Sequence, residues 1–245
     1  MRNKTYFISD IHLGAAYIAD HRAHEKAIAG WLKKIAPTAA RLYLLGDILD
    51  YWFEYKEVVP RGYLRFFGAL AELADSGVEV VWLKGNHDIW IFDYLPQELG
   101  IKVVDGLIDT VIDGKRFVME HGDGVGESRP SYRRMRSIFR NRICQKLFSA
   151  IHPRWTVPFA HRWSSHSRST GRAAVDLPQN HRLVNFATNY EKANGHVDYF
   201  IFGHLHLVAD REITPGTRLV VLGDAFCAMT CGCFDGKEFF IDKIE

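Results

Sequence analysis

The sequence feature that most constrains this chain is an apolar run that ends on a side chain able to bind a metal ion. Within residues 41–50, apolar residues lead into Gly46, and Asp47 follows at once. The apolar run predicts a fully buried strand, and the glycine predicts a sharp exit that turns the next side chain into a crevice. Because a buried carboxylate is costly unless something positive meets it, the pattern indicates a cationic partner for Asp47.

The same pattern occurs four more times, with strands expected at 5–9, 78–83, 116–120 and 199–202. The residues that follow these strands are Asp10 and His12, then Asn86, His87 and Asp88, then His121 and Asp123, and finally His204 and His206. Helices predicted at 20–35, with Asp20 as N-cap, and at 61–76 separate the first three strands. Strands that alternate with helices predict βαβ units, whose ligands gather at the carboxyl ends of the strands.

The later part of the chain predicts a second sheet. A hairpin with an Asp-Gly turn is expected at 111–118. Strands at 199–202, 218–222 and 238–241 are expected to complete that sheet. The predicted fold is therefore α/β (α+β), a two-sheet sandwich flanked by helices. With 245 residues and 47% hydrophobic content, the chain is sized for a single domain over residues 1–245.

A basic insertion between two donor-bearing strands predicts a helical cap over approximately residues 125–177. From 129 to 172 the chain has ten Arg, one Lys and no acidic residue, whereas the remainder has 20 basic and 29 acidic residues. The segment is therefore built to meet an anion. The alternative is a solvated helical pair with ordinary surface ion pairs, but the absence of local Asp or Glu argues against it.

Prolines and periodicity predict the helices of this cap. One helix is expected from Pro130 to about residue 150, broken by Pro153 and Pro158. A second short helix is expected at 159–167, and a further helix at 179–192 leads back to the sheet. Aromatic residues are interleaved with the arginines throughout.

The donors at the strand ends suit a two-metal site. They are three carboxylate or amide side chains and four imidazoles, namely Asp10, Asp47, Asn86, His12, His121, His204 and His206. Each alone has an ordinary alternative, because a single Asp or His after a strand is usually a turn or core residue. Together they exceed what one ion needs and suit two ions about 3.5–4 Å apart. Mixed oxygen and nitrogen ligands favour Mn, Fe or Zn, and Mn2+ is our first expectation.

Five motifs in this order, D-x-H, G-D-x-x-D, G-N-H-D, H-G and G-H-x-H, closely resemble those of the calcineurin-like metallophosphoesterases. They span residues 10–206. The resemblance implies a two-sheet sandwich and two divalent ions that acidify water for attack on a phosphoester. It also implies one metal held by Asp10, His12, Asp47 and His206, and another held by Asp47, Asn86, His121 and His204, with Asp47 as the bridge.

Two further residues of the G-N-H-D motif are candidate catalytic residues. His87 follows a predicted ligand, so it is placed to contact the phosphate or to protonate the leaving oxygen. Asn86 is a candidate substrate contact as well as a ligand. Asp88 is expected to orient His87, with a turn-capping role as an equal alternative.

Within this superfamily, the chain most resembles the UDP-2,3-diacylglucosamine pyrophosphatases of lipid A biosynthesis. Its length, the cap and the His-Gly-Asp at 121–123 carry this resemblance. It implies a nucleotide-linked glycolipid substrate, cleaved to UMP and an acylated sugar phosphate at the cytoplasmic face of the inner membrane. Tyr132, Ser167 and Arg168 are the candidate substrate contacts in the cap. One difference is His87, where better-known members of that group have Arg.

Three alternative functions remain from the residues alone. A nuclease would also use arginines with interleaved aromatics, although nucleases of this superfamily are typically longer. A small soluble phosphodiester is a second alternative, for which so large a cap is unnecessary. A non-enzymatic scaffold is the third, but it normally requires lost ligands, and none is missing. Nucleic acid is therefore not an expected partner, and the oligomeric state is left open.

The expected location is the cytoplasm, with peripheral association at the inner membrane. The N-terminus is basic, but only five residues separate its first four from Asp10, which is too short for the apolar core of a signal peptide. No apolar run approaches membrane-spanning length. The four cysteines are accordingly expected to be reduced thiols, without the paired spacing of a zinc site.

Overall fold

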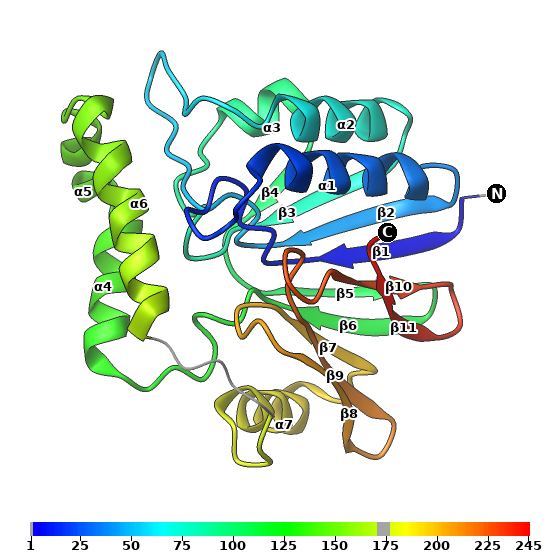
Figure 1. Cartoon of the computed structure of the whole chain (residues 1–245). Coiled ribbons are helices and arrows are strands. Elements are labelled where there is room, and N and C mark those ends of the chain that lie inside the picture. The colour runs from blue at the N-terminus through cyan, green and yellow to red at the C-terminus, as the bar shows by residue number, and fades with distance from the viewer. Residues whose placement is uncertain (1, 171–176) are drawn as a thin grey trace.

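The computed structural model describes residues 2–170 and 177–245, with the backbone alone for 161 and 163–170. Two sheets lie face to face, and helices cover their outer faces (Figure 1). Three further helices stand beside the sandwich at one end of the sheets (Figure 1). The predicted two-sheet sandwich flanked by helices is confirmed.

The first sheet has six strands in the order β11-β10-β1-β2-β3-β4. Their bounds are β1 Lys4–Ile8, β2 Ala39–Leu45, β3 Glu79–Leu83, β4 Lys102–Val104, β10 Thr230–Phe234 and β11 Phe239–Lys243. Strands β1 to β4 are parallel, whereas β10 is antiparallel to both β1 and β11. The prediction that the strand at 238–241 completes the second sheet was wrong. The short Thr-Cys-Gly-Cys-Phe run of β10, which was not predicted, forms a hairpin with β11 and joins both to β1.

The second sheet has five strands in the order β5-β6-β7-β9-β8. Their bounds are β5 Ile108–Ile112, β6 Lys115–Met119, β7 Tyr199–Phe202, β8 Val208–Thr214 and β9 Thr217–Leu222. The predicted hairpin joins β5 to β6, and its turn residues Asp113 and Gly114 both have positive φ, as a tight hairpin turn requires. Strands β6, β7 and β9 are parallel, so the residues after β6 and β7 emerge at the same edge.

Helices α1 His21–Ile35, α2 Leu64–Asp75 and α3 Tyr94–Leu99 follow the strands of the first sheet, and α7 Arg182–Asn194 precedes β7. The predicted N-cap is present, because the Asp20 carboxylate accepts a hydrogen bond from the backbone N–H of Ala23 at 2.9 Å. Helix α2 begins later than predicted. The reason is local, since Gly62 and Tyr63 have φ values of +118° and +61°, which no right-handed helix can include.

Successive side chains of a strand point to opposite faces of its sheet, and this divides the core into three layers. In β1, Phe7 points between the sheets, whereas Tyr6 and Ile8 point outward to α1 and α2. In β7, Ile201 lies between the sheets, whereas Phe200 faces α7. Both sheets are therefore buried on two faces, which explains why their central strands read as continuous apolar runs.

The basic insertion forms three helices, α4 Pro130–Arg140, α5 Arg142–Ser149 and α6 Pro153–Thr170. The single helix predicted over 130–150 is interrupted at Asn141, whose extended backbone and side-chain hydrogen bonds to Ile143 N and Cys144 N start a new helix. Pro153 begins α6, where it has no hydrogen bond to lose, and Pro158 lies inside that helix. The predicted break at Pro158 was therefore wrong.

We call the segment from α4 to α6 the cap. Its predicted limits, 125–177, and the single-domain organisation remain predictions, because residues 171–176 lie outside the described residues. Among the described residues, no helix has both the length and the apolar character needed to cross a bilayer.

Phe7 should be a principal contributor to stability. Its buried ring stacks on those of Tyr43 and Phe117, at centroid distances of 5.4 and 5.7 Å, and thus joins the two sheets. We expect Phe7→Ala to lower the free energy of unfolding by about 3–5 kcal/mol, measured by urea denaturation. Val111→Ala, at a position on β5 that is 65% exposed, is the matched control and should change it by less than about 0.5 kcal/mol. Equal effects of the two substitutions would contradict this description of the core.

Candidate metal centre

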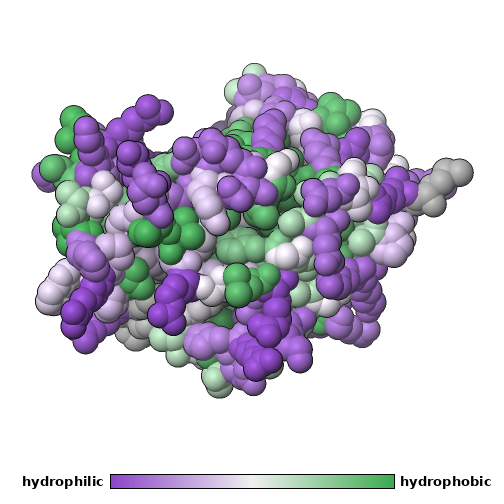
Figure 2. Space-filling view, turned by 90° about the horizontal axis from the view of Figure 1, so that it is seen from above, coloured by the Kyte–Doolittle hydropathy of each residue, from purple (hydrophilic) through white to green (hydrophobic). Residues whose placement is uncertain are grey.

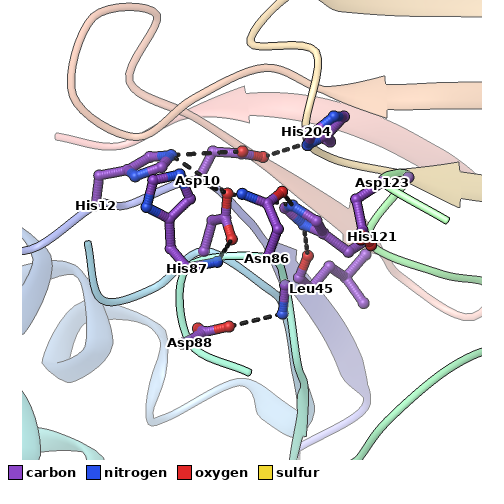
Figure 3. A network of polar contacts seen from close by, with 12 residues as sticks. Asp10, His12, Leu45, Asn86, His87, Asp88, His121, Asp123 and His204 are labelled. Carbon is purple, nitrogen blue, oxygen red and sulfur yellow. Dashed lines mark hydrogen bonds and ion pairs between the residues drawn. The ribbon is translucent and has the colours of Figure 1, made fainter. Parts of the chain in front are cut away.

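The predicted donors from both sheets meet at one edge of the sandwich (Figure 3). The first sheet supplies those that follow β1, β2 and β3, and the second sheet supplies those that follow β6 and β7. All seven lie at carboxyl ends of parallel strands: Asp10, His12, Asp47, Asn86, His121, His204 and His206. The site therefore exists only where the two sheets are packed together.

Five of these donors have left-handed backbone conformations, which non-glycine residues seldom adopt. Their φ values lie between 49° and 67°, and they are Asp10, His12, Asp47, His204 and His206. Each such residue costs of order 1 kcal/mol and persists only where its surroundings hold it. The strained exits turn the side chains back across the strand ends, toward a common centre.

Two glycines allow the backbone to approach the carboxylates. A Cβ atom at Gly85 would collide with the Asp47 carboxylate and its backbone nitrogen, and one at Gly203 would lie 2.5 Å from Asp10 Oδ2. These are the glycines of the G-N-H-D and G-H-x-H motifs. Their role is thus close packing against a donor.

The first group of donors comprises Asp10, His12 and His206, whose ligand atoms lie within 4.8 Å of one another. Asp10 Oδ2 accepts a hydrogen bond from the backbone N–H of His204 at 2.8 Å, which leaves Oδ1 facing His206 Nε2 at 3.4 Å and His12 Nε2 at 3.8 Å. One carboxylate oxygen and two imidazole nitrogens therefore converge on one point.

The second group comprises Asp47, His121 and His204, again within 4.8 Å of one another. Asp47 Oδ2 lies 3.2 Å from His121 Nε2 and 3.7 Å from His12 Nε2, so Asp47 faces donors of both groups, and its role as a bridge remains a prediction. His121 Nδ1 lies 2.8 Å from the carbonyl oxygen of Leu45, which favours a proton on Nδ1 and leaves Nε2 as the ligand atom. The amide oxygen of Asn86 lies 3.3 Å from that Nε2.

The carboxylates attract positive charge strongly. Burial lowers the pKa of His12, but the nearby Asp10 and Asp50 carboxylates outweigh it and raise that pKa to about 9. Burial lowers the pKa of His204 to about 4, with the nearby His121 contributing, so this imidazole is neutral at pH 7, the form that binds metal. The site thus combines anionic oxygens with a neutral nitrogen ligand.

Besides their charge, the lack of hydrogen-bond partners for some buried donor atoms indicates that the donors fit divalent cations. Asp10 Oδ1 and His12 Nε2 are buried and, within the part of the chain that is described, have no hydrogen-bond partner. Buried polar atoms normally have such a partner. Two divalent ions, held by the residues of the two groups, would satisfy these atoms and supply the missing positive charge. Assignment of individual ligands to each ion remains a prediction.

His87 points into the same centre, and its neighbour Asp88 does not (Figure 3). His87 Nδ1 lies 2.8 Å from the backbone carbonyl oxygen of Asp50, and its Nε2 lies 3.9 Å from Asp47 Oδ2. The buried Asp88 carboxylate instead accepts hydrogen bonds from Gly85 N, Ile48 N and the Trp82 indole. Of the two equal expectations for Asp88, these contacts match the turn-capping role and not the orientation of His87: Asp88 orders the loop that carries Asn86 and His87.

Two further carboxylates near the centre were not predicted to have a role, although Asp50 is the last residue of the G-D-x-x-D motif. Asp50 Oδ1 lies 3.4 Å from His12 Nδ1, and Asp224 Oδ2 lies 3.7 Å from His206 Nδ1. Each faces the ring nitrogen on the far side of a donor, the position from which a carboxylate orients a metal-binding histidine. The signal for Asp224 was present, since Leu222-Gly223-Asp224 repeats the strand–Gly–Asp pattern of Asp47.

The cap is attached to the loop that follows His121. The buried Asp123 carboxylate accepts a hydrogen bond from Arg136 Nε on α4 at 2.8 Å, and Tyr132 lies 3.5 Å from the same oxygen. On the other side, the Trp90 indole donates to the carbonyl of Phe139 at 2.9 Å. Tyr132, a predicted cap contact, therefore stands at the edge of the centre. The other two, Ser167 and Arg168, lie outside the residues whose side chains are described.

The number of bound metal ions should differ between a variant that lacks Asp47 and one that lacks His206. We expect equilibrium dialysis to give two Mn2+ ions per chain, about one for His206→Ala, and neither tightly bound for Asp47→Ala, because Asp47 faces donors of both groups. At a Mn2+ concentration of 100 times the dissociation constant, binding should stabilise the fold by about 2.7 kcal/mol, measured as a rise in melting temperature. Full binding by Asp47→Ala would refute the bridging role.

The chain matches the family model described as calcineurin-like phosphoesterase over residues 4–208. It is 39% identical to the UDP-2,3-diacylglucosamine hydrolase of Porphyromonas gingivalis, over an alignment that covers 100% of this chain and 99% of that protein. The hydrolase of the same name from Haemophilus influenzae is 28% identical, with 90% of each chain covered. The family match spans most of the chain and includes all five motifs, so this chain belongs to the calcineurin-like phosphoesterase family.

Proposed function

We propose that this chain hydrolyses the pyrophosphate bond of UDP-2,3-diacylglucosamine to give UMP and 2,3-diacylglucosamine 1-phosphate. The observation that carries the proposal is a continuous cavity that joins the candidate metal centre to an apolar space under the cap. The similarity of the whole chain to hydrolases named for this substrate supports it.

The cavity has a volume of about 410 Å³. Its polar end is formed by residues of the centre, among them Asn86, His87 and His204. Its other walls are mainly apolar and come from the cap and from the loop after β3: Ile89, Trp90, Met135, Ile138, Phe139, Phe148 and Phe159. A substrate with a phosphate group and an acyl chain matches this division, because each part meets surroundings of its own polarity.

Basic side chains also line the cavity. Arg136 and Arg140 of α4 line the cavity beside Tyr132. Arg136 is held by the Asp123 carboxylate, so its position is fixed before a ligand enters. Guanidinium groups in the cavity wall suit the negative charge of a pyrophosphate or sugar phosphate.

His87 is the residue best placed to act on the leaving oxygen. Its Nδ1 faces the carbonyl of Asp50, so its Nε2 points into the centre. About one fifth of the side chain is exposed, so a substrate can reach it. A protonated Nε2 would donate its proton to the bridging oxygen of the pyrophosphate, which is released on the sugar phosphate when the P–O bond to the UMP phosphorus breaks. Divalent ions at such a centre acidify water and neutralise charge that develops on the phosphoryl group.

The proposal includes two further elements. Mn2+ is the expected metal, with Fe or Zn as alternatives, because the donors are oxygens and imidazole nitrogens. The expected location is the cytoplasm, with peripheral association at the inner membrane, where a substrate with two acyl chains resides.

Hydrolysis should be detectable directly. With Mn2+ and UDP-2,3-diacylglucosamine in detergent, phosphorus NMR is expected to show release of UMP, and His121→Ala should abolish it because that variant loses a buried ligand of the second group. An aryl phosphodiester and single-stranded DNA serve as parallel substrates. Turnover of the aryl ester alone would retain the phosphoesterase and exclude the lipid substrate, and preferential cleavage of DNA would support a nuclease.

The apolar walls should determine affinity for the acylated substrate. We expect Met135→Asp to raise KM for UDP-2,3-diacylglucosamine roughly tenfold or more, because a carboxylate in an acyl-binding wall must be desolvated. The KM for the aryl ester should change little, since that substrate needs only the metal centre. Equal changes for both substrates would show that the substitution disturbs the centre and that the cavity does not hold the acyl chain.

A further inference from the structure

The cap exposes large apolar side chains on its outer surface, away from the cavity. Ile143 and Leu147 on α5 are 71% and 66% exposed, and Trp155 in the first turn of α6 is 69% exposed. Ile151, between the two helices, is 49% exposed. We call these four residues the cap ridge. Ile143 and Leu147 are four residues apart on α5, which places them on one side of that helix.

Helix α5 has two apolar faces with different neighbours. Cys144 and Phe148 line the cavity, and the Phe148 ring packs 5.1 Å from those of Trp90 and Phe53. Ile143 and Leu147 precede them by one residue, about 100° around the helix axis, and face solvent. The inner face thus accounts for the packing of the helix, and the outer face has no structural role in the chain as described.

Basic residues alternate with the cap ridge. Arg142, Lys146 and Arg154 are exposed, and none forms an ion pair with another described residue. No acidic residue occurs between 129 and 170. In Figure 2 the cap lies at the left, where hydrophobic and hydrophilic residues are interspersed over its surface. An apolar strip flanked by cations is the composition of a helix that lies in the headgroup region of an anionic bilayer.

We propose that the cap ridge docks this chain on an anionic membrane surface, with Ile143, Leu147 and Trp155 inserted among the lipids. The inference rests on the proposed function, since it gives the route by which an acylated substrate reaches the cavity. Because α5 contacts the membrane on one face and lines the cavity on another, an acyl chain has only one helix to pass when it leaves the bilayer.

Two other occupants fit the ridge less well. A nucleic acid would gain from the arginines, but three of the four ridge residues are aliphatic and offer no ring on which a base could stack. A second copy of the chain would bring two faces of the same positive charge together about a twofold axis, which is unfavourable. A bilayer with anionic headgroups satisfies both the apolar and the basic residues.

The test is co-sedimentation with vesicles of phosphatidylglycerol and phosphatidylethanolamine, compared with vesicles of phosphatidylcholine. We expect the full chain to bind the anionic vesicles and Ile143→Ser/Leu147→Ser to bind them at least roughly tenfold more weakly. Lys146→Glu should also weaken binding, and added salt should reduce binding of the wild-type chain. The matched control is Leu64→Ser, at an apolar position that is 81% exposed at the start of α2, and it should bind as the wild type does.

Hydrolysis of the soluble aryl ester provides the check on folding, and the double variant should retain it because neither residue lines the cavity. Vesicle binding is measured without turnover, so loss of activity toward the glycolipid would not affect this test. Equal vesicle binding by the wild type and the double variant would overturn the proposal. So would loss of single-stranded DNA binding, or of dimerisation, in the double variant while vesicle binding is unchanged.

Discussion

The buried Asp47 carboxylate is the group on which the arrangement of the centre depends. Its oxygens face His121, His12 and His87, which come from different loops and from both sheets. Burial raises the pKa of Asp47, but the surrounding imidazoles, His121 foremost, hold it well below its ordinary value. An anion in so enclosed a place requires cations around it, so the sequence that buries Asp47 must also deliver histidines from distant parts of the chain.

The attachment of the cap follows from the same electrostatics. Asp123 lies in the loop after His121, and it is buried together with Glu120. Arg136 reaches both carboxylates, at 2.8 and 3.6 Å, and thereby joins α4 to the loop that carries a metal donor. A basic insertion is therefore held in place by acidic residues of the sandwich. The arginines near the centre serve partly as anchors, whereas the exposed ones further along the cap remain available to other partners.

Much of the fold and of the metal centre could be predicted from the sequence because the pattern that indicates each donor is local. Each donor follows an apolar run directly, so strand position and chemistry are encoded within about ten residues, and parallel topology then brings the strand ends together. The place of β10 and β11 in the first sheet could not be predicted in this way. The pairing of β10 with β1 joins residues more than 200 positions apart, and the small residues of β10 resemble a loop.

The side-chain partners of individual residues could not be predicted from the sequence pattern either. Asp88 and Asp50 each end a donor motif, yet the first bonds to backbone and indole N–H groups and the second faces two imidazoles. Spacing alone cannot distinguish them, because the choice depends on the direction in which each loop leaves its strand. In the cap, the continuity of α6 through Pro158 depends on the helix as a whole and not on the proline alone.

The division of the donors between two sheets has a consequence for how the protein is made. During synthesis, Asp10, His12, Asp47 and Asn86 emerge early, but the sheet that holds them gains β10 and β11 only from the last residues of the chain. His204 and His206 also appear late, beyond the cap. Each of the two donor groups includes one of these late histidines, so neither group is complete before the residues after β7 have been synthesised.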